Sequence, residues 1–235
     1  MNDSLYSTMM SDRLPYPLFL QVAQRPVLIV GGGAVGLRKA RGLCEAGAEV
    51  TVVSLTFHEG FEQLPHVHKR VGGYQTALMA GDQGGRRWRL VFAATDDPAL
   101  NAQVQRDATE AGILVCRCDE PEAGDFSGGA THQQPGLTVA VSTQGGAPSL
   151  AARMREQAVA AIDPELIAWS QRLKQWREEV LAALPEAALR RKLLLRLASA
   201  EMERLWREEG AERAQACFSK WLAEARGEVT ERPHV

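Results

Sequence analysis

The fold of this 235-residue chain is decided by the stretch Val27-Leu28-Ile29-Val30-Gly31-Gly32-Gly33-Ala34-Val35-Gly36. Its four apolar residues predict a buried strand, and its glycines satisfy the spacing G-x-G-x-x-G. Gly31 permits a tight turn, Gly33 lets the backbone approach a pyrophosphate, and Gly36 lets a helix pack closely on the strand. Because the loop follows a strand and opens a helix over Val35–Ala46, it predicts a dinucleotide-binding site at the helix N-terminus. The alternative is a glycine-rich turn in an α/β protein without a cofactor.

The sequence around this loop alternates short apolar runs with helical patterns. Strands are expected at Val27–Val30, Glu49–Val53, Leu90–Ala94, Ile113–Cys118 and Leu137–Val141. Helices are expected at Val35–Ala46 and Pro98–Ala111, each followed by a glycine, and Asp97 is the expected N-cap of the second. Repeated strand, helix and strand predict an α/β fold with a Rossmann-type parallel sheet and right-handed crossovers.

The pattern changes after Gly146, and no strand is predicted between Pro148 and Arg226. Leucines and tryptophans recur at spacings of three and four from Leu166 to Leu184, which predicts a helix that Pro185 ends. Two further amphipathic stretches follow, and we interpret their apolar residues as core rather than as a cofactor site. We therefore expect three parts: a NAD-binding domain at 1–120, a connecting segment at 121–160, and a helical domain at 161–235.

Composition excludes several classes of protein. A hydrophobic content of 45% with 24% charged residues is typical of a soluble globular chain, and a net charge of −2 does not indicate a nucleic-acid partner. The apolar runs are too short to span a membrane, and Met1–Arg13 lacks the apolar segment of a signal peptide. Four irregularly spaced cysteines do not form a disulfide framework, so we expect a cytoplasmic protein with reduced thiols.

The expected cofactor contacts lie just beyond the carboxyl ends of the predicted strands. We expect the loop residues Gly31, Gly33, Ala34, Val35 and Gly36 to hold the pyrophosphate. The acidic residue that usually hydrogen-bonds the adenosine ribose is absent from Val53-Ser54-Leu55-Thr56, and this stretch has no arginine to bind the 2′-phosphate of NADP. The Ser54 hydroxyl, or the backbone around Leu55 and Thr56, would have to bind the ribose instead, which favours NAD over NADP. Thr95 and Asp96 follow another strand and are expected to line the cofactor cleft.

Four segments of the chain match a known family in order. They are Pro17–Leu20, Val30–Gly33 with Arg38–Ala40, Ala94–Asp97 with Asn101, and Val139–Thr143 with Gly145–Pro148. Together they resemble the precorrin-2 dehydrogenases, NAD-dependent enzymes of siroheme synthesis. Some members are also sirohydrochlorin ferrochelatases, and others form the N-terminal half of a larger siroheme synthase. The resemblance covers about residues 15–160, and the helical part beyond it matches only in kind and length.

The resemblance implies NAD-dependent oxidation of precorrin-2 to sirohydrochlorin. Such a reaction needs a hydride acceptor and a base or positioned carboxylate, and the resemblance places the catalytic aspartate at Asp119. Without the resemblance, Asp119 would be interpreted as a turn residue before Pro121. The substrate carries many carboxylates, so cations should bind it. The expected substrate-binding residues are Arg117, Ser142, Thr143, Gly145 and Arg153, with Arg155 as a further candidate cation.

The sequence departs from the family at the substrate loop. The run Phe126-Ser127-Gly128-Gly129-Ala130 replaces the family's Phe, aliphatic residue, Pro and Ala, which leaves the chelatase activity open. In that second hypothesis, ferrous iron is a substrate and Asp119 accepts pyrrole protons without a dedicated metal site. Cys116 and Cys118 share one side of a strand, but a metal site there would need His132, and buried thiols are the favoured interpretation.

Two further hypotheses concern partners. The alternative to an enzyme is an NAD(H)-sensing regulatory module that catalyses no reaction. Such modules usually accompany a DNA-binding or channel element, and the sequence shows neither. A homodimer is expected, because the strand Leu137–Val141 and the helix after Pro148 resemble the family's dimerisation region. The resemblance thus implies that residues 121–160 form a dimerisation and substrate-loop segment.

Overall fold

The computed structural model describes residues 14–230, and the expectation for Met1–Arg13 lies outside the described residues. These residues form two compact units, one of residues 14–128 and 143–147 and the other of residues 129–142 and 148–230. These two units are defined by the contacts that residues make within each unit, and not by function. The functional division at 1–120, 121–160 and 161–235 stays a prediction.

The first unit is built on a five-stranded parallel sheet in the order β3-β2-β1-β4-β5. Its strands are β1 (Pro26–Val30), β2 (Glu49–Ser54), β3 (His68–Val71), β4 (Leu90–Ala93) and β5 (Leu114–Arg117). Val30 pairs with Val53 and Ala93, and Ala93 pairs with Arg117, so four strands end at one edge of the sheet. The Rossmann-type parallel sheet predicted from the sequence is confirmed.

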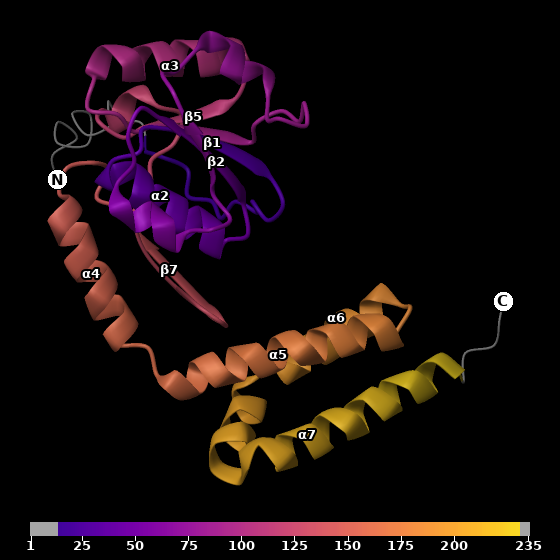
Figure 1. The fold of residues 1–235 in the computed structure, drawn as a ribbon. Helices are drawn as coiled ribbons and strands as arrows, with labels where there is room; N and C mark the ends of the chain where they lie inside the picture. The colour runs from indigo at the N-terminus through magenta and orange to yellow at the C-terminus, as the bar shows by residue number, and fades with distance from the viewer. Residues whose placement is uncertain (1–13, 231–235) are drawn as a thin grey trace, which may run out of the picture. The chain divides into compact units, whose positions relative to one another are not determined.

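Helices cover both faces of this sheet, with α2 (Ala34–Glu45) on one face and α3 (Pro98–Glu110) on the other (Figure 1). Successive residues of β1 point to opposite faces: Ile29 packs in a core with Leu37 of α2, and Leu28 packs in a core with Val104 of α3. Burial on both faces is why the central strands are almost wholly apolar. Short 3₁₀ helices, η1 (Glu59–Gln63), η2 (Thr76–Ala80) and η3 (Pro121–Ala123), lie in the connections.

Three strands differ from the prediction. β3 is missing from the sequence prediction because its residues, His68 to Val71, are all exposed at the edge of the sheet and carry no apolar run. Leu137–Val141 is a strand (β7), but it lies outside the parallel sheet and pairs antiparallel with β6 (Ala130–Gln134). β6 is polar and was not expected. Half-buried and exposed residues alternate along β7, which is the pattern of a strand covered on one face only.

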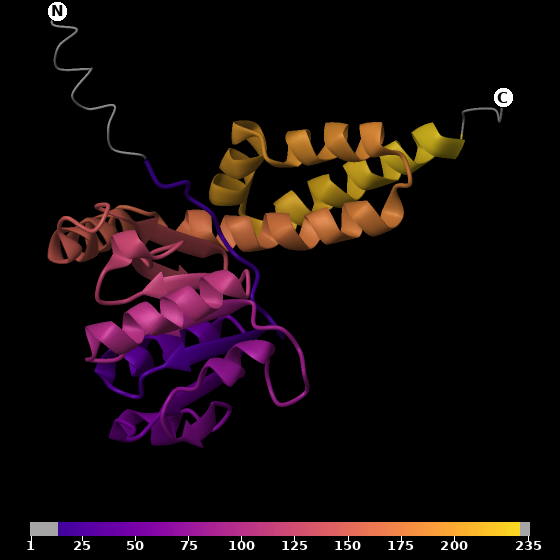
Figure 2. The ribbon, with the colours of Figure 1, turned by 90° about the horizontal axis from the view of Figure 1, so that it is seen from above.

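The second unit contains this hairpin and four helices: α4 (Pro148–Ala160), α5 (Pro164–Ala183), α6 (Ala187–Leu197) and α7 (Ala200–Thr230). Figure 2 shows α5, α6 and α7 lying side by side. Their core is aromatic: the rings of Trp176 and Phe218 stack with centroids 4.9 Å apart, and Trp169 meets Trp176 edge-on at 5.5 Å. The interpretation of the tryptophan and leucine stripe as core is therefore confirmed. No helix within residues 14–230 is long and apolar enough to cross a membrane.

Candidate active site

Two glycines of the loop after β1 have no room for a side chain. Gly31 has φ +120°, and its N–H donates to the Val53 carbonyl at 2.9 Å. A Cβ on Gly31 would lie 2.3 Å from the Ala94 carbonyl oxygen, and one on Gly36 would lie 2.0 Å from the Gly31 carbonyl oxygen. The glycines therefore let β1, β4 and α2 approach one another through their backbones.

Gly32 is a third required glycine, to which the sequence analysis gave no role. Its Cβ would lie 2.4 Å from the Thr56 carbonyl oxygen, and its own carbonyl accepts a hydrogen bond from the His58 N–H at 2.8 Å. The G-x-G-x-x-G spacing leaves this position free, so only the packing of the next loop reveals the requirement. Gly32 ties the glycine loop to the segment after β2.

Gly33 faces open space instead. It is the N-cap of α2, no side chain caps the helix there, and the first turn contains no acid. A Cβ on Gly33 would meet nothing within 4 Å. The uncapped N–H groups of α2, with the positive end of its dipole, form a site that fits the pyrophosphate of a dinucleotide. Ala34 and Val35 form the exposed first turn beside it.

The predicted ribose contacts lie at the end of β2. Ser54 is half-buried as the last residue of the strand, whereas Leu55 is 74% exposed and Thr56 is also exposed. A Cβ on Gly32 would lie 2.8 Å from the Ser54 Cβ and 3.0 Å from its hydroxyl oxygen, so Ser54 borders the glycine loop. The structure brings these residues to one edge with Gly33, and their contact with ribose stays a prediction.

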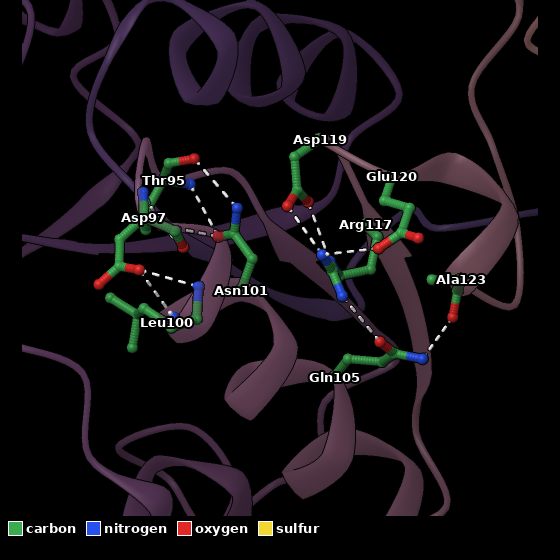
Figure 3. Close-up of polar contacts among 10 residues, drawn as sticks. Thr95, Asp97, Leu100, Asn101, Gln105, Arg117, Asp119, Glu120 and Ala123 are labelled. Atoms are coloured by element: carbon green, nitrogen blue, oxygen red, sulfur yellow. Dashed lines mark hydrogen bonds and ion pairs between the residues drawn. The ribbon is translucent and has the colours of Figure 1, made fainter.

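At the end of β4, Thr95 is held by a buried asparagine. The Thr95 hydroxyl and N–H donate to the Asn101 Oδ1 at 2.7 and 3.1 Å, and the Asn101 amide donates to the Thr95 carbonyl at 3.0 Å (Figure 3). Asp97 accepts hydrogen bonds from the Ala99 and Leu100 N–H groups, which confirms it as the N-cap of α3. Asp96 between them is exposed.

Asp119 lies just beyond β5 in a two-pronged pair with Arg117. The Arg117 Nε lies 2.9 Å from Asp119 Oδ1, and Nη2 lies 2.8 Å from Oδ2. The same guanidinium donates to Gln105 of α3 at 3.0 Å and to Glu120 at 3.2 Å (Figure 3). The Gln105 amide in turn donates to the Ala123 carbonyl. The Arg117 side chain is 5% exposed and that of Asp119 is 25% exposed, so the carboxylate faces solvent in front of a buried cation.

This pairing fixes the charge of Asp119. The pKa of Asp119 is lowered to about 2, mainly by the hydrogen bonds from Arg117 and also by one from Asn101, against the opposing effect of burial. Asp119 is therefore ionised throughout the neutral range. It can stabilise positive charge and orient N–H donors, but it is a weak proton acceptor. Arg117 lies behind Asp119 as its partner, and its predicted contact with substrate carboxylates stays a prediction.

The remaining predicted substrate residues lie in a loop and in the second unit. The Thr143 hydroxyl accepts a hydrogen bond from the Ala147 N–H at 3.2 Å, and Gly145 within that turn has φ +81°. Ser142 and Arg153, an exposed residue of α4, belong to the second unit. Among residues 14–230, no group of three or more histidine, cysteine or acidic side chains is placed to hold a metal ion.

The comparisons with known proteins agree with this architecture. Residues 18–130 match a family model described as putative NAD(P)-binding. The siroheme synthase of Tolumonas auensis is 34% identical over 209 residues, which are 88% of this chain and 43% of that protein. The siroheme synthase of Azotobacter vinelandii is 39% identical over 182 residues, 74% of this chain and 37% of that protein. The chain thus spans less than half the length of these curated relatives.

A solved structure shares the fold. The precorrin-2 dehydrogenase SirC superimposes with a TM-score of 0.65 at 22% sequence identity, covering 89% of this chain and all of that one. The predicted combination of a Rossmann-type sheet with a helical C-terminal region is confirmed by this likeness.

Proposed function

We propose that this chain, a homologue of the siroheme synthases over 88% of its length, oxidises precorrin-2 to sirohydrochlorin with NAD as the hydride acceptor. One observation carries the proposal: the uncapped N-terminus of α2 and the ionised carboxylate of Asp119 follow strands that end at the same edge of one sheet. In open α/β sheets, ligands bind at this edge.

Residues of the first unit would hold the cofactor. The backbone of Gly31–Gly36 would bind the pyrophosphate, and Ser54, Leu55 and Thr56 would bind the ribose. Thr95 and Asp96 would line the cleft, where Asn101 keeps the Thr95 backbone in place. When bound, NAD supplies the acceptor for the hydride that the substrate loses.

Asp119 would act on the substrate as a fixed anion. Loss of a hydride leaves positive charge on the tetrapyrrole, and a carboxylate that is already oriented by Arg117 stabilises this charge without reorganisation. The same carboxylate can accept hydrogen bonds from pyrrole N–H groups. Ser142, Thr143, Gly145 and Arg153 are proposed to bind the substrate's polar periphery.

The decisive test supplies precorrin-2 and NAD to the purified chain and follows NADH at 340 nm. We expect NADH formation that depends on both protein and substrate. No signal above the protein-free blank would reject the proposal. NAD binding without turnover would instead support the alternative of a non-catalytic NAD(H)-sensing module.

Iron insertion into sirohydrochlorin is a second candidate activity, favoured by the name siroheme synthase that the relatives carry. Its mechanism would require a group to accept two pyrrole protons, and the low pKa of Asp119 makes this residue a weak acceptor. The test compares ferrous iron insertion with and without protein. A protein-dependent rate would support the activity, and equal rates would reject it.

A homodimer in the cytoplasm is the proposed state of the protein. The hairpin β6–β7 packs on α4, which exposes the apolar side chains of Leu150 and Met154. A second copy could cover these side chains. Light scattering should give twice the chain mass, and a monomer would contradict the dimer.

A further inference from the structure

Lys39 of α2 is a cation to which the proposed reaction gives no role. It lies in the second turn of the helix and is half-buried. Its Nζ lies 5.8 Å from the ring centroid of Phe92, which is buried in β4. Phe126 packs edge-on against the same ring, with the two centroids 5.3 Å apart. The stem of Lys39 thus covers apolar surface while its ammonium reaches toward the loop after β5.

The loop after β5 leaves room for this ammonium at Gly128. A Cβ on Gly128 would lie 2.9 Å from the Lys39 Nζ. Gly128 belongs to the run Phe126–Ala130, which the family resemblance makes the substrate loop. Because Gly128 and its neighbour Ser127 are exposed, a ligand that contacts this loop can also reach the Lys39 ammonium.

Lys39 has no carboxylate partner within the part of the chain that the structure describes. By contrast, the half-buried Arg155 pairs with Glu156 at 2.7 Å, and the buried Arg117 pairs with Asp119. Water screens a half-buried ammonium beside aromatic rings less than it screens one at the open surface, so an anion that reaches it is bound more strongly. The environment of Lys39 therefore fits a carboxylate that a ligand supplies.

The position of Lys39 relative to Asp119 fits a tetrapyrrole. Phe92, which Lys39 overlies, pairs with Cys116 in the sheet, and Asp119 follows Cys116 by three residues. At about 3.3 Å per residue, Asp119 stands no more than about 10 Å along the chain from the residue that pairs with Phe92. A tetrapyrrole has its N–H groups at the centre of the ring and its carboxylates on side chains at the periphery. Asp119 can therefore face the centre while Lys39 reaches a peripheral carboxylate.

We propose that Lys39 binds a side-chain carboxylate of the tetrapyrrole and so helps to hold the ring against Asp119. The inference rests on the proposed function, because it takes precorrin-2 as the substrate. The Arg117 guanidinium is already paired with Asp119, whereas the Lys39 ammonium is available to a ligand. Lys39 acts in binding and not in hydride transfer, so its loss should raise KM and spare kcat.

Steady-state kinetics separate this binding role from a structural one. Lys39→Gln should raise the KM for precorrin-2 about tenfold, which is typical for the loss of one charged hydrogen bond, while kcat and the Kd for NAD change less than about twofold. Lys39→Arg keeps the charge and should hold KM within about threefold of wild type. An unaltered KM in Lys39→Gln, or no rescue by arginine, would overturn the proposal.

The matched control is Lys69→Gln. It makes the same change at an exposed position of β3, which lies at the opposite edge of the sheet from β5. Its KM for precorrin-2 should equal that of wild type. A rise as large as that in Lys39→Gln would show that loss of any positive charge weakens binding, and this would overturn a specific role for Lys39.

Binding of sirohydrochlorin tests the contact without turnover. This product carries the same carboxylates, and its absorbance can be titrated with protein in the absence of NAD and iron. We expect the Kd to be about tenfold higher for Lys39→Gln at low salt, and the difference to shrink at about 1 M NaCl, where the Debye length is about 3 Å. Equal Kd values at low salt would overturn the proposal, whether or not NADH is formed. If the expected difference is found but wild type forms no NADH, only the proposed function fails.

A double-mutant cycle tests the contact between Lys39 and the loop. In Gly128→Ala the new Cβ must displace the Lys39 ammonium, so the KM for precorrin-2 should rise about threefold. In the Lys39→Gln background, the same change at Gly128 should have almost no effect. Equal effects in both backgrounds would contradict the placement of the ammonium on which the proposal rests.

Discussion

The glycine loop and the end of β5 lie at the same edge of the sheet but are built in opposite ways. Around the loop, backbone atoms approach so closely that a single added carbon at Gly31 or Gly36 meets a carbonyl oxygen. At the end of β5, side chains form the structure, with Arg117 joined to Asp119 and to Gln105. We therefore expect an added carbon atom to disrupt the glycine loop. We expect the loss of a charge or a hydrogen-bond donor to disrupt the Arg117–Asp119 network.

Adding one carbon to the loop should have the largest effect. In Gly36→Ala the Cβ would lie 2.0 Å from the Gly31 carbonyl oxygen, so α2 must shift away from the loop. We expect NAD affinity to fall more than 100-fold and the free energy of unfolding to fall by about 1–3 kcal/mol, as for overpacked cores. Calorimetric titration and urea unfolding measure the two.

The matched control is Gly33→Ala, because its Cβ meets nothing and its φ of −77° suits alanine. Its free energy of unfolding should stay within about 0.5 kcal/mol of wild type. Wild-type NAD affinity in Gly36→Ala would contradict the tight-packing account.

Removing the charge of Asp119 should have the next largest effect. Asp119→Asn keeps the shape but loses the anion, so kcat should fall by roughly 10²–10³-fold while the Kd for NAD changes less than twofold. The turnover assay at 340 nm and an NAD titration measure these. Glu120→Gln alters the other, largely exposed carboxylate paired with Arg117 and should retain kcat within about twofold. Full turnover in Asp119→Asn would remove the catalytic assignment.

Removing Arg117 should have a smaller and pH-dependent effect. In Arg117→Gln the pKa of Asp119 should rise toward its usual value near 3.9, while the carboxylate stays ionised at pH 7 but loses its orientation. We expect about tenfold lower kcat at pH 7. The lowered pKa of Asp119 stabilises wild type above about pH 4, and this stability disappears as the pH falls toward 2.

Urea unfolding between pH 7 and pH 2 tests whether the stabilisation from the lowered pKa of Asp119 is lost as the pH falls. The variant should be less stable than wild type by about 2 kcal/mol at pH 7, and the difference should shrink between pH 4 and 2. A constant difference at both ends of the range would mean that Arg117 acts by packing rather than through the charge of Asp119.

The smallest effect is expected away from both regions. Gly42 lies within α2 and its Cβ would meet nothing within 4 Å. Gly42→Ala should therefore stabilise the protein by about 0.5–1 kcal/mol, because alanine restricts the unfolded chain. Thermal unfolding should show a higher Tm with unchanged turnover. A lower Tm would show that glycine is required in α2 beyond the positions that touch the loop.

The sheet could be predicted where strands are buried on both faces. The central strands carry apolar runs because both α2 and α3 cover them, and a run of that kind is visible in sequence. The edge strand His68–Val71 and the hairpin partner Ala130–Gln134 lack such runs, since one is exposed and the other is covered on one side. For the same reason β7 was assigned as a strand without its antiparallel partner.

The site was predicted less completely than the fold. Asp119 was assigned from the family resemblance, and its role stays a prediction that the Asn variant tests. Asn101 appeared among the matched residues without a role, and Gln105 did not appear, yet both donate or accept hydrogen bonds around the Arg117–Asp119 pair. Alternation along a strand tells which residues share a face, but not which helix residues meet them.

The sequence alone determined the features whose causes are local: the glycine spacing after a buried strand, the Asp97 cap, and the tryptophan stripe of the helical core. Tertiary structure decided the charge and orientation of Asp119. Its partners come from β5 and α3, up to 18 residues apart in the chain, and they converge only when α3 packs on the sheet. It likewise decided that Gly32 must be glycine, because the loop after β2 closes over it.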